Sequence, residues 1–429
     1  MSIPRIAVLH QPFGAASLHD LRRAAVGVCQ PVLILTDRTA RTHPDLHRAA
    51  EALFPVTVAA DENVIGAVRS LAVQGVTTFH DQLLERVEAV AVDLDLPGMH
   101  SAGVWNKLTQ RQTLARAGLT RVRALAVDSV DDLDRSVAKL GLPCVLKPRR
   151  GVGGDGIALI RSDADVNHQY THRRRWPGLV LETMLPPGRH PGGDLLADFV
   201  SVETVHTGRT SRHVAVFDKR EVTISHRAGA DGADLVTVTG DVVPSRLPGP
   251  ALDEVLEYAS RCLHALGVRW RVTHTEIKLT PDGPDIIEVN GRMGGHLNRL
   301  LRLVGGPDLA RMALTVALGR DEPVEPWNPR GYAAGLFPSF PRRDGVVRSR
   351  VTAAELRSLP GVRGIDEFAR AGQPRADTGF RMVNLTLTAA TPAEMDERIQ
   401  RTTSALEHLY TADLDPDGPR AARDTERSG

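Results

Sequence analysis

The stretch HTEIKLTPDGPDIIEVNGR, from His274 to Arg292, carries the most informative pattern in the sequence. Two runs rich in β-forming residues flank a turn at 280–284, which predicts an antiparallel hairpin. Side chains alternate faces along a strand, so a hairpin centred on Asp282 places Glu276 opposite Glu288, with their Cβ atoms about 5 Å apart. Two ionised carboxylates at that separation repel each other by a few kcal/mol at an effective dielectric of about 20. A bound divalent cation removes this repulsion.

The neighbours of these two acids favour a metal site. Asn290 shares a face with Glu288, and two carboxylates with an amide oxygen are hard ligands suited to Mg²⁺ that bridges nucleotide phosphates. The alternative is an exposed hairpin with solvated acids, which the flanking residues Ile277, Ile286, Ile287 and Val289 disfavour. Arg292 follows two residues later, where its planar guanidinium can hold a phosphate or a carboxylate.

A glycine-rich loop at 151–156 is the second informative pattern. Its spacing matches a dinucleotide-binding motif, but a strand follows it where that motif needs a helix, and no P-loop motif is present. A glycine hairpin that follows Lys147 can instead fold over a triphosphate, with backbone N–H groups and the lysine facing phosphate oxygens. The alternative is a flexible surface hairpin.

Lysine is scarce, with five residues against 48 arginines. A GC-rich coding bias explains the excess of arginine, so each remaining lysine is a candidate for a role that suits a compact ammonium group, such as binding phosphate. Lys219 either reaches a substrate or belongs to a surface ion-pair cluster, and Lys139 is expected on an exposed helix face.

Length and composition limit the function classes. The 429 residues allow two to four domains. Fifty-three basic and 52 acidic residues give a net charge of +1, which argues against a nucleic-acid or anionic-membrane partner. We find no membrane-spanning run and no signal peptide. Three widely separated cysteines match neither a disulfide framework nor a metal motif, so a reducing cytoplasm is expected.

Alternating strand and helix patterns over 1–104 predict a small parallel α/β domain. A Pro-rich change of composition near 323–329 predicts a linker. A small α+β domain is expected over 323–412, with this linker at its start. The charged segment 413–429 is expected to be a frayed tail.

With these motifs in this order, the chain resembles the ATP-grasp superfamily over roughly 106–319. Lys107, at the start of a predicted helix, is similar to the first phosphate-binding lysine of that family. Lys147 with the glycine loop resembles the second lysine and the phosphate-covering loop, and the segment 181–185 is similar to the adenine-binding hinge.

The resemblance implies an ATP-grasp fold of mixed α/β and α+β class, with a central domain at 105–322 and a glycine-loop subdomain at about 119–184. It implies Mg²⁺, or Mn²⁺ in its place, at Glu276, Glu288 and Asn290. The ATP contacts that it implies are Lys107, Lys147, Gly153, Gly154, Gly156, Glu182, Thr183, Met184 and Leu185, with Asp198 expected at the ribose.

Two departures from the family matter. Arg189 and His190 stand near the place of the usual acidic ribose-binding residue, which is why Asp198 is the expected substitute. His274 stands where D-alanine–D-alanine ligases carry an arginine. The His274–Glu276 run, the Gly294–Gly295 pair and the C-terminal domain look more like L-amino-acid ligases of the bacilysin-synthetase type.

The resemblance implies that a carboxylate attacks the γ-phosphate of ATP, and that an amine then displaces phosphate from the acylphosphate to form an amide. Arg292, Lys147 and His274 are the residues expected at the reacting groups. The expected partners are ATP and small carboxylate and amine substrates, with no nucleic acid or membrane, and the expected assembly is a homodimer. The alternatives are a carboxylase or phosphoribosyl-type ligase with the same nucleotide machinery, and a non-catalytic nucleotide-binding module.

Overall fold

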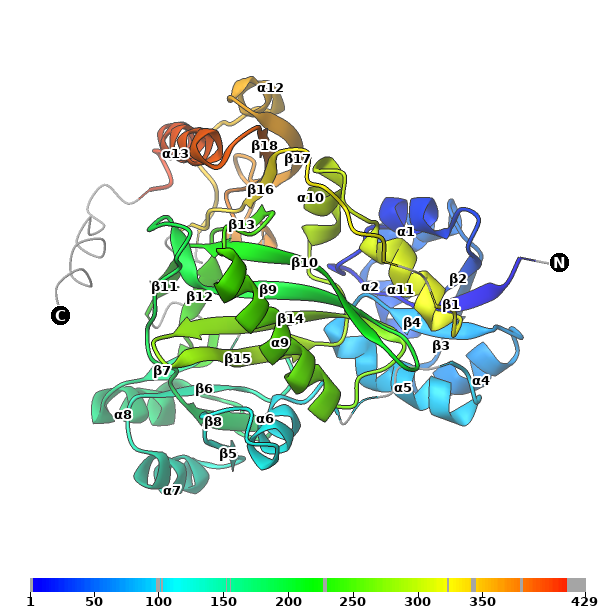
Figure 1. The fold of residues 1–429 in the computed structure, drawn as a ribbon, viewed down its shortest axis with the longest axis horizontal. Coiled ribbons are helices and arrows are strands. Elements are labelled where there is room, and N and C mark those ends of the chain that lie inside the picture. The colour runs from blue at the N-terminus through cyan, green and yellow to red at the C-terminus, as the bar shows by residue number, and fades with distance from the viewer. Residues whose placement is uncertain are drawn as a thin grey trace.

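The computed structural model describes residues 3–97, 101, 103–151, 153–154, 156–226, 230–321, 324–340, 345–378 and 381–414. Figure 1 shows a large central sheet with the N-terminal domain, the glycine-loop subdomain and the C-terminal unit placed around it. Within the described ranges, no helix combines the length and apolar character needed to cross a membrane.

The N-terminal domain is built on a parallel sheet of four strands in the order β3-β2-β1-β4, as predicted. These are β1 (Arg5–Leu9), β2 (Gln30–Thr36), β3 (Val56–Ala59) and β4 (Gly75–Thr78). The first two strands are apolar along almost their whole length, because helices cover both faces of such a sheet. The helical elements are α1 (Leu18–Ala25), α2 (Asp37–Thr42), α3 (Pro44–Glu51), η1 (Asp61–Asn63), α4 (Val64–Arg69), η2 (Asp81–Leu83) and α5 (Leu84–Asp93).

The central sheet has eight antiparallel strands in the order β15-β14-β9-β10-β13-β16-β18-β17. Its first five strands along the chain are β9 (Leu196–His206), β10 (Ser211–Arg220), β13 (Gly240–Val243), β14 (Arg271–Thr280) and β15 (Gly283–Asn290). Helix α9 (Gly249–Ala265) packs on this sheet through Val255, Tyr258, Ala259 and Cys262, which follow helical spacing. Helices α10 (Leu297–Leu303) and α11 (Leu309–Ala317) join the sheet to the N-terminal core.

The glycine-loop subdomain holds a separate antiparallel sheet in the order β5-β8-β6-β7. Its elements are β5 (Ala124–Val127), α7 (Val130–Leu140), β6 (Cys144–Pro148), β7 (Ala158–Ile160), α8 (Asp163–His172) and β8 (Leu179–Thr183), preceded by α6 (Lys107–Arg116). A two-stranded ribbon, β11 (Val222–Ser225) with β12 (Leu235–Val238), lies against the glycine loop: a Cβ added at Gly154 would lie 2.5 Å from the Val236 carbonyl oxygen.

The C-terminal unit shares the central sheet. Strand β16 (Tyr332–Leu336) pairs with β13, and β18 (Val383–Ala389) and β17 (Val362–Phe368) follow it, with helices α12 (Ala353–Ser358) and α13 (Pro392–Leu409). The expected tail begins too early at 413, because the buried Asp413 carboxylate accepts hydrogen bonds from the backbone N–H groups of Arg348 and Ser349 at 2.9 and 2.8 Å. Residues 415–429 of that expected tail lie outside the described residues.

Candidate active site

The predicted pairing of Glu276 with Glu288 is confirmed in the β14–β15 hairpin, but the geometry behind it differs from the prediction. The strands are joined by a two-residue turn at 281–282, a register that by itself would place Ile287 opposite Glu276. A bulge leaves Ile287 unpaired and shifts the register by one residue, which brings Glu288 opposite Glu276. The two carboxylates therefore share a face because of the bulge.

Glu288 is the most constrained of the predicted metal ligands. Its Oε2 lies 2.9 Å from Nζ of Lys107, and Asn290 Nδ2 donates a hydrogen bond of 3.1 Å to its Oε1. Burial by itself raises the pKa of Glu288, but the nearby ammonium groups of Lys107 and Lys147 outweigh that effect and bring the pKa to about 2. The carboxylate is therefore ionised over the whole physiological range.

His274 joins Glu276 to a residue that the sequence analysis missed, Glu203. Its Nδ1 lies 2.5 Å from Glu203 Oε1, its Nε2 lies 3.2 Å from Glu276 Oε1, and Glu203 also accepts the backbone N–H of Gly294 at 3.0 Å. Burial lowers the pKa of His274, but the two carboxylates raise it above its ordinary value. An imidazolium that donates to both acids explains the arrangement. The sequence feature that could have identified Glu203 is the presence of an acid within the otherwise apolar run 199–205.

Lys147 lies in a buried cluster with Glu182 and Arg111. Glu182 Oε2 lies 2.9 Å from Lys147 Nζ and 3.2 Å from Arg111 Nε, and Glu182 Oε1 has no hydrogen-bond partner among the described residues. Burial raises the pKa of Glu182, but the two cations lower it below its ordinary value.

Arg111 was also missed by the sequence analysis. Its Nη1 and Nη2 donate to the carbonyl oxygens of Ile286 and Ile287 at 2.5 and 2.6 Å, so helix α6 holds the bulge in place. Arg111 could have been predicted as a site residue from its position one turn after Lys107, because residues four apart share a helix face.

Lys107 and the glycine loop meet directly. Lys107 begins α6, where the Asn106 side chain caps the helix, and its Nζ donates to the carbonyl oxygen of Gly151 at 3.0 Å. The predicted loop glycines Gly153, Gly154 and Gly156 all have positive φ angles, at 65°, 75° and 75°. Val152 and Asp155 lie outside the described residues.

The predicted hinge runs out of β8. The backbone N–H groups of Thr183 and Met184 donate to the carbonyl oxygens of Arg123 and Pro143 at 3.0 and 3.2 Å. In the part of the chain that the structure describes, the N–H of Leu185 has no protein acceptor.

Asp198, the expected ribose contact, already uses both carboxylate oxygens. Lys278 Nζ lies 2.6 Å from Oδ1, and the Gly188 N–H donates to Oδ2 at 2.8 Å. Its role at a ribose stays a prediction.

Arg292 contacts the N-terminal domain. Its Nε and Nη2 lie 2.7 and 2.5 Å from Oδ2 of Asp81 in η2, and its Nη1 donates to the Met293 carbonyl oxygen. A second ion pair, Arg271 with Glu88 at 2.5 Å, joins β14 to α5. Asp81 was missed because 211 residues separate it from Arg292.

The scarcity of lysine was informative. Four of the five lysines are at least partly buried and form ion pairs, and Lys139 is exposed. Lys219 lies 2.6 Å from Asp241 Oδ1 and is only 5% exposed, so it is no surface lysine.

The three proposed metal ligands do not by themselves complete the coordination shell of a divalent cation. The described residues contain no group of three or more His, Cys, Asp or Glu side chains placed to hold a metal ion. Glu276, Glu288 and Asn290 supply two carboxylates and one amide oxygen, a hard donor set that fits Mg²⁺ only with water and phosphate oxygens completing its shell.

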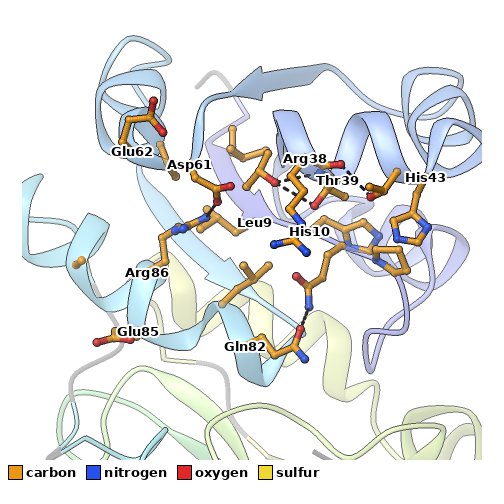
Figure 2. A pocket seen from close by; sticks show the side chains of 18 of the residues that line it. Leu9, His10, Arg38, Thr39, His43, Asp61, Glu62, Gln82, Glu85 and Arg86 are labelled. Carbon is orange, nitrogen blue, oxygen red and sulfur yellow. Dashed lines mark hydrogen bonds and ion pairs between the residues drawn. The ribbon is translucent and has the colours of Figure 1, made fainter. Parts of the chain in front are cut away.

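Two cavities flank the loop at 10–13 that follows β1. The larger, of about 850 Å³, lies at the carboxyl edge of the N-terminal sheet and is shown in Figure 2. The smaller, of about 620 Å³, lies between α1, α10 and Asp366 of β17, and His296 lines it.

No family model matches the chain. The chain is 25% identical over 354 residues to uncharacterized protein y4rH of Sinorhizobium fredii, covering 79% of this chain and 69% of that protein. It is 26% identical over 355 residues to human carnosine synthase 1, covering 77% of this chain and 39% of the synthase. It is 24% identical over 275 residues to alanine–anticapsin ligase of Bacillus subtilis, covering 59% of this chain and 56% of the ligase.

Two solved structures share the fold over almost the whole chain. The L-amino acid ligase from Bacillus licheniformis superposes with a TM-score of 0.70 at 16% identity, covering 94% of this chain and 98% of that one. N5-carboxyaminoimidazole synthetase from Staphylococcus aureus, complexed with ADP, gives 0.66 at 13% identity, covering 94% and 97%. At identities of 16% and 13%, these comparisons show that the fold is shared.

Proposed function

We propose that this chain, an ATP-grasp ligase that resembles the L-amino-acid ligases, forms an amide bond between two amino acids at the expense of ATP. The observation that carries the proposal is the placement of two ammonium groups around Glu288, the carboxylate opposite Glu276. Lys107 contacts Glu288, Lys147 adds to the field on the same carboxylate, and Arg292 follows on the same hairpin. Such a site suits a triphosphate with a divalent cation.

The nucleotide would bind by exchanging ion-pair partners. Lys107 and Lys147 now contact Glu288 and Glu182, and phosphate oxygens of ATP would compete for the two ammonium groups. At the base, the free oxygen of Glu182 can accept a hydrogen bond and the N–H of Leu185 can donate one. An adenine edge offers the matching amino group and ring nitrogen.

The site residues would hold charge in place as it develops. Glu276, Glu288 and Asn290 would hold Mg²⁺ or Mn²⁺, which neutralises phosphate charge when bound. His274 orients Glu276 and is itself fixed by Glu203. The forked guanidinium of Arg292 would leave Asp81 and contact the transferred phosphoryl group.

Two steps would follow, in which the chain supplies position and charge. The carboxylate oxygen of one amino acid attacks the γ-phosphorus of ATP and ADP leaves, giving an acylphosphate. The amine of the second amino acid then attacks the carbonyl carbon. The C–O bond to phosphate breaks, phosphate leaves with the bonding electrons, and the amine proton passes to phosphate or solvent.

The test is phosphate release from Mg-ATP with free amino acids, singly and in pairs, followed by mass spectrometry. We expect ADP, phosphate and a product whose mass equals two amino acids less water. Glu288→Ala should abolish this activity, while Glu397→Ala, on the exposed face of α13, should retain it. If ATP raises the melting temperature but no amino acid pair stimulates release, the amino-acid assignment is wrong, and bicarbonate would be tested next.

A further inference from the structure

We propose that the cavity of about 850 Å³ at the carboxyl edge of the N-terminal sheet binds the amine substrate of this ligase. It would take a small molecule that carries both an amino group and a carboxylate, which His10 and Arg38 would hold. This inference rests on the proposed ligation, and it assigns the second substrate to a site outside the ATP-grasp domain.

Sheet topology favours a ligand at this edge. The chain leaves β1 for β2 on one side, and β4 returns on the other side of β1. In open parallel sheets the loops diverge at such a reversal, and ligands bind in the crevice that they leave at the carboxyl ends of the strands. His10 directly follows β1 and His80 follows β4 by two residues, so both stand at this point.

The hydrogen bonds of the two histidines assign their protons. The backbone N–H of Gln11 donates to His80 Nε2 at 3.4 Å, so this nitrogen is an acceptor. His10 Nδ1 lies 3.2 Å from the same nitrogen, and we take the tautomer in which His10 Nδ1 carries the proton between them. His10 Nε2 is then left with its lone pair, and His10 lines the cavity.

Burial keeps both imidazoles neutral. It lowers the pKa of His10 to about 4, and burial, with smaller contributions from His10 and Arg292, lowers the pKa of His80 to about 3. His10 can therefore accept a hydrogen bond from an amino or ammonium group at neutral pH, and the ammonium releases a proton to solvent before its nitrogen attacks.

Arg38 places a positive charge at the cavity, whose lining also includes the carboxylate of Glu62. Arg86 is paired with Asp61 at 2.7 Å and Glu85 is paired with Arg150 at 2.6 Å. For Arg38, by contrast, no carboxylate lies within ion-pair distance in the described part of the chain.

Figure 2 shows the Arg38 side chain reaching from α2 toward His10 and Gln82, while Glu62 lies apart from Arg38, beside Asp61. One guanidinium matches the single charge of a carboxylate, and its planar fork suits that group. A phosphate dianion would retain uncompensated charge next to Asp61 and Glu85, so we assign the carboxylate.

One wall of the cavity is connected to the proposed reaction centre through η2. Gln82 lines the cavity and hydrogen-bonds to Gln11, and the residue before it, Asp81, lies 2.5 Å from Nη2 of Arg292. Arg292 also acts on the pKa of His80, which contacts His10, so an amine held at His10 would lie in the same neighbourhood as the guanidinium that would hold the acylphosphate. The two substrates would approach this point from different domains.

The test compares Arg38→Gln with Arg41→Gln, which changes an exposed arginine on the same helix that does not line the cavity. With an active substrate pair, Arg38→Gln should raise the KM of the amine component by about 10- to 100-fold. The KM of ATP and the kcat at saturation should change by less than about twofold, and Arg41→Gln should behave as the natural protein. An unchanged KM for the amine component in Arg38→Gln would overturn the inference while the proposed function stands.

A ligand-side control isolates the carboxylate contact. The amide of the same amine substrate lacks the carboxylate, so the natural protein and Arg38→Gln should use it with the same KM. If Arg38→Gln weakens the amide as strongly as the acid, Arg38 does not contact the carboxylate.

A direct binding measurement separates the inference from the proposed function. If the natural protein ligates no pair, its melting temperature is measured with each L-amino acid, with β-alanine and with inorganic phosphate. A rise with an amino acid that Arg38→Gln loses and Arg41→Gln keeps would support the site. A rise with phosphate alone, or no rise at all, would refute it.

Discussion

Glu182→Gln tests the buried cluster on which the nucleotide site is built. The change keeps the shape of the side chain but removes the negative charge between Lys147 and Arg111, at 2.9 and 3.2 Å. At an effective dielectric of about 20, each attraction amounts to about 5–6 kcal/mol before the cost of desolvation. Breaking a buried ion pair by changing one partner costs about 3–5 kcal/mol, because the remaining charge stays buried. We therefore expect the free energy of unfolding to fall by about 3–5 kcal/mol.

The pH dependence of this loss follows from the pKa of Glu182. Burial raises that pKa but Arg111 and Lys147 lower it, and the net shift is downward in the folded chain. The stabilisation is thus fully present above the ordinary glutamate pKa of about 4.3, and it is lost as the pH falls through the folded value. The difference in the free energy of unfolding between the natural protein and Glu182→Gln should be constant near neutral pH and should become smaller in acid.

The assay is equilibrium unfolding in urea, followed both by circular dichroism and by tryptophan fluorescence because the sheets need not unfold together. Glu397→Gln is the matched control, since its ion pair with Arg401 at 2.7 Å is more than half exposed and contributes at most about 0.5 kcal/mol. A loss in Glu182→Gln no larger than in Glu397→Gln would refute the reasoning.

Three further outcomes are expected. Gly154→Ala should weaken ATP binding at least about tenfold in a titration, because its Cβ would lie 2.5 Å from the Val236 oxygen at φ +75°. Gly153→Ala should lose less affinity for ATP. Its added Cβ would have no atom within 4 Å, so only the backbone at φ +65° is strained. Arg292→Lys should lower kcat for phosphate release by about 10²–10³-fold with little change in the KM of ATP, because the planar fork of the guanidinium is lost. Equal changes in kcat and in the KM of ATP would contradict a role at the transferred phosphoryl group. Burial raises the thiol pKa of all three cysteines to between about 11 and about 12, so mass spectrometry should find no alkylation of the native protein at pH 8 and three alkylated thiols in denaturant.

Local patterns in the sequence were enough to predict the main parts of the fold. The alternation of apolar strands with helices over 1–104 predicted the parallel sheet, because buried parallel strands need continuous apolar runs. The two-residue period at 274–279 and 286–290 predicted the two strands of the β14–β15 hairpin. These properties depend on chain geometry over a few residues, so sequence alone carries them.

The register of the hairpin shows where such reasoning stops. The predicted centre at Asp282 gave the right pairing, although the turn is shorter and a bulge at Ile287 compensates for it. Arg111 of α6 holds that bulge through two carbonyl oxygens. A contact between a helix and a strand 175 residues apart cannot be read from the local pattern.

The sequence by itself determined which segments form the N-terminal sheet and the β14–β15 hairpin. The tertiary structure alone decided which charges meet there: Asp81 with Arg292, Glu203 with His274, and Arg111 with Glu182. It also decided that the C-terminal strands continue the central sheet. The physical reason is that periodicity fixes the direction of a side chain, whereas the choice among 52 acids and 53 bases depends on how distant elements pack.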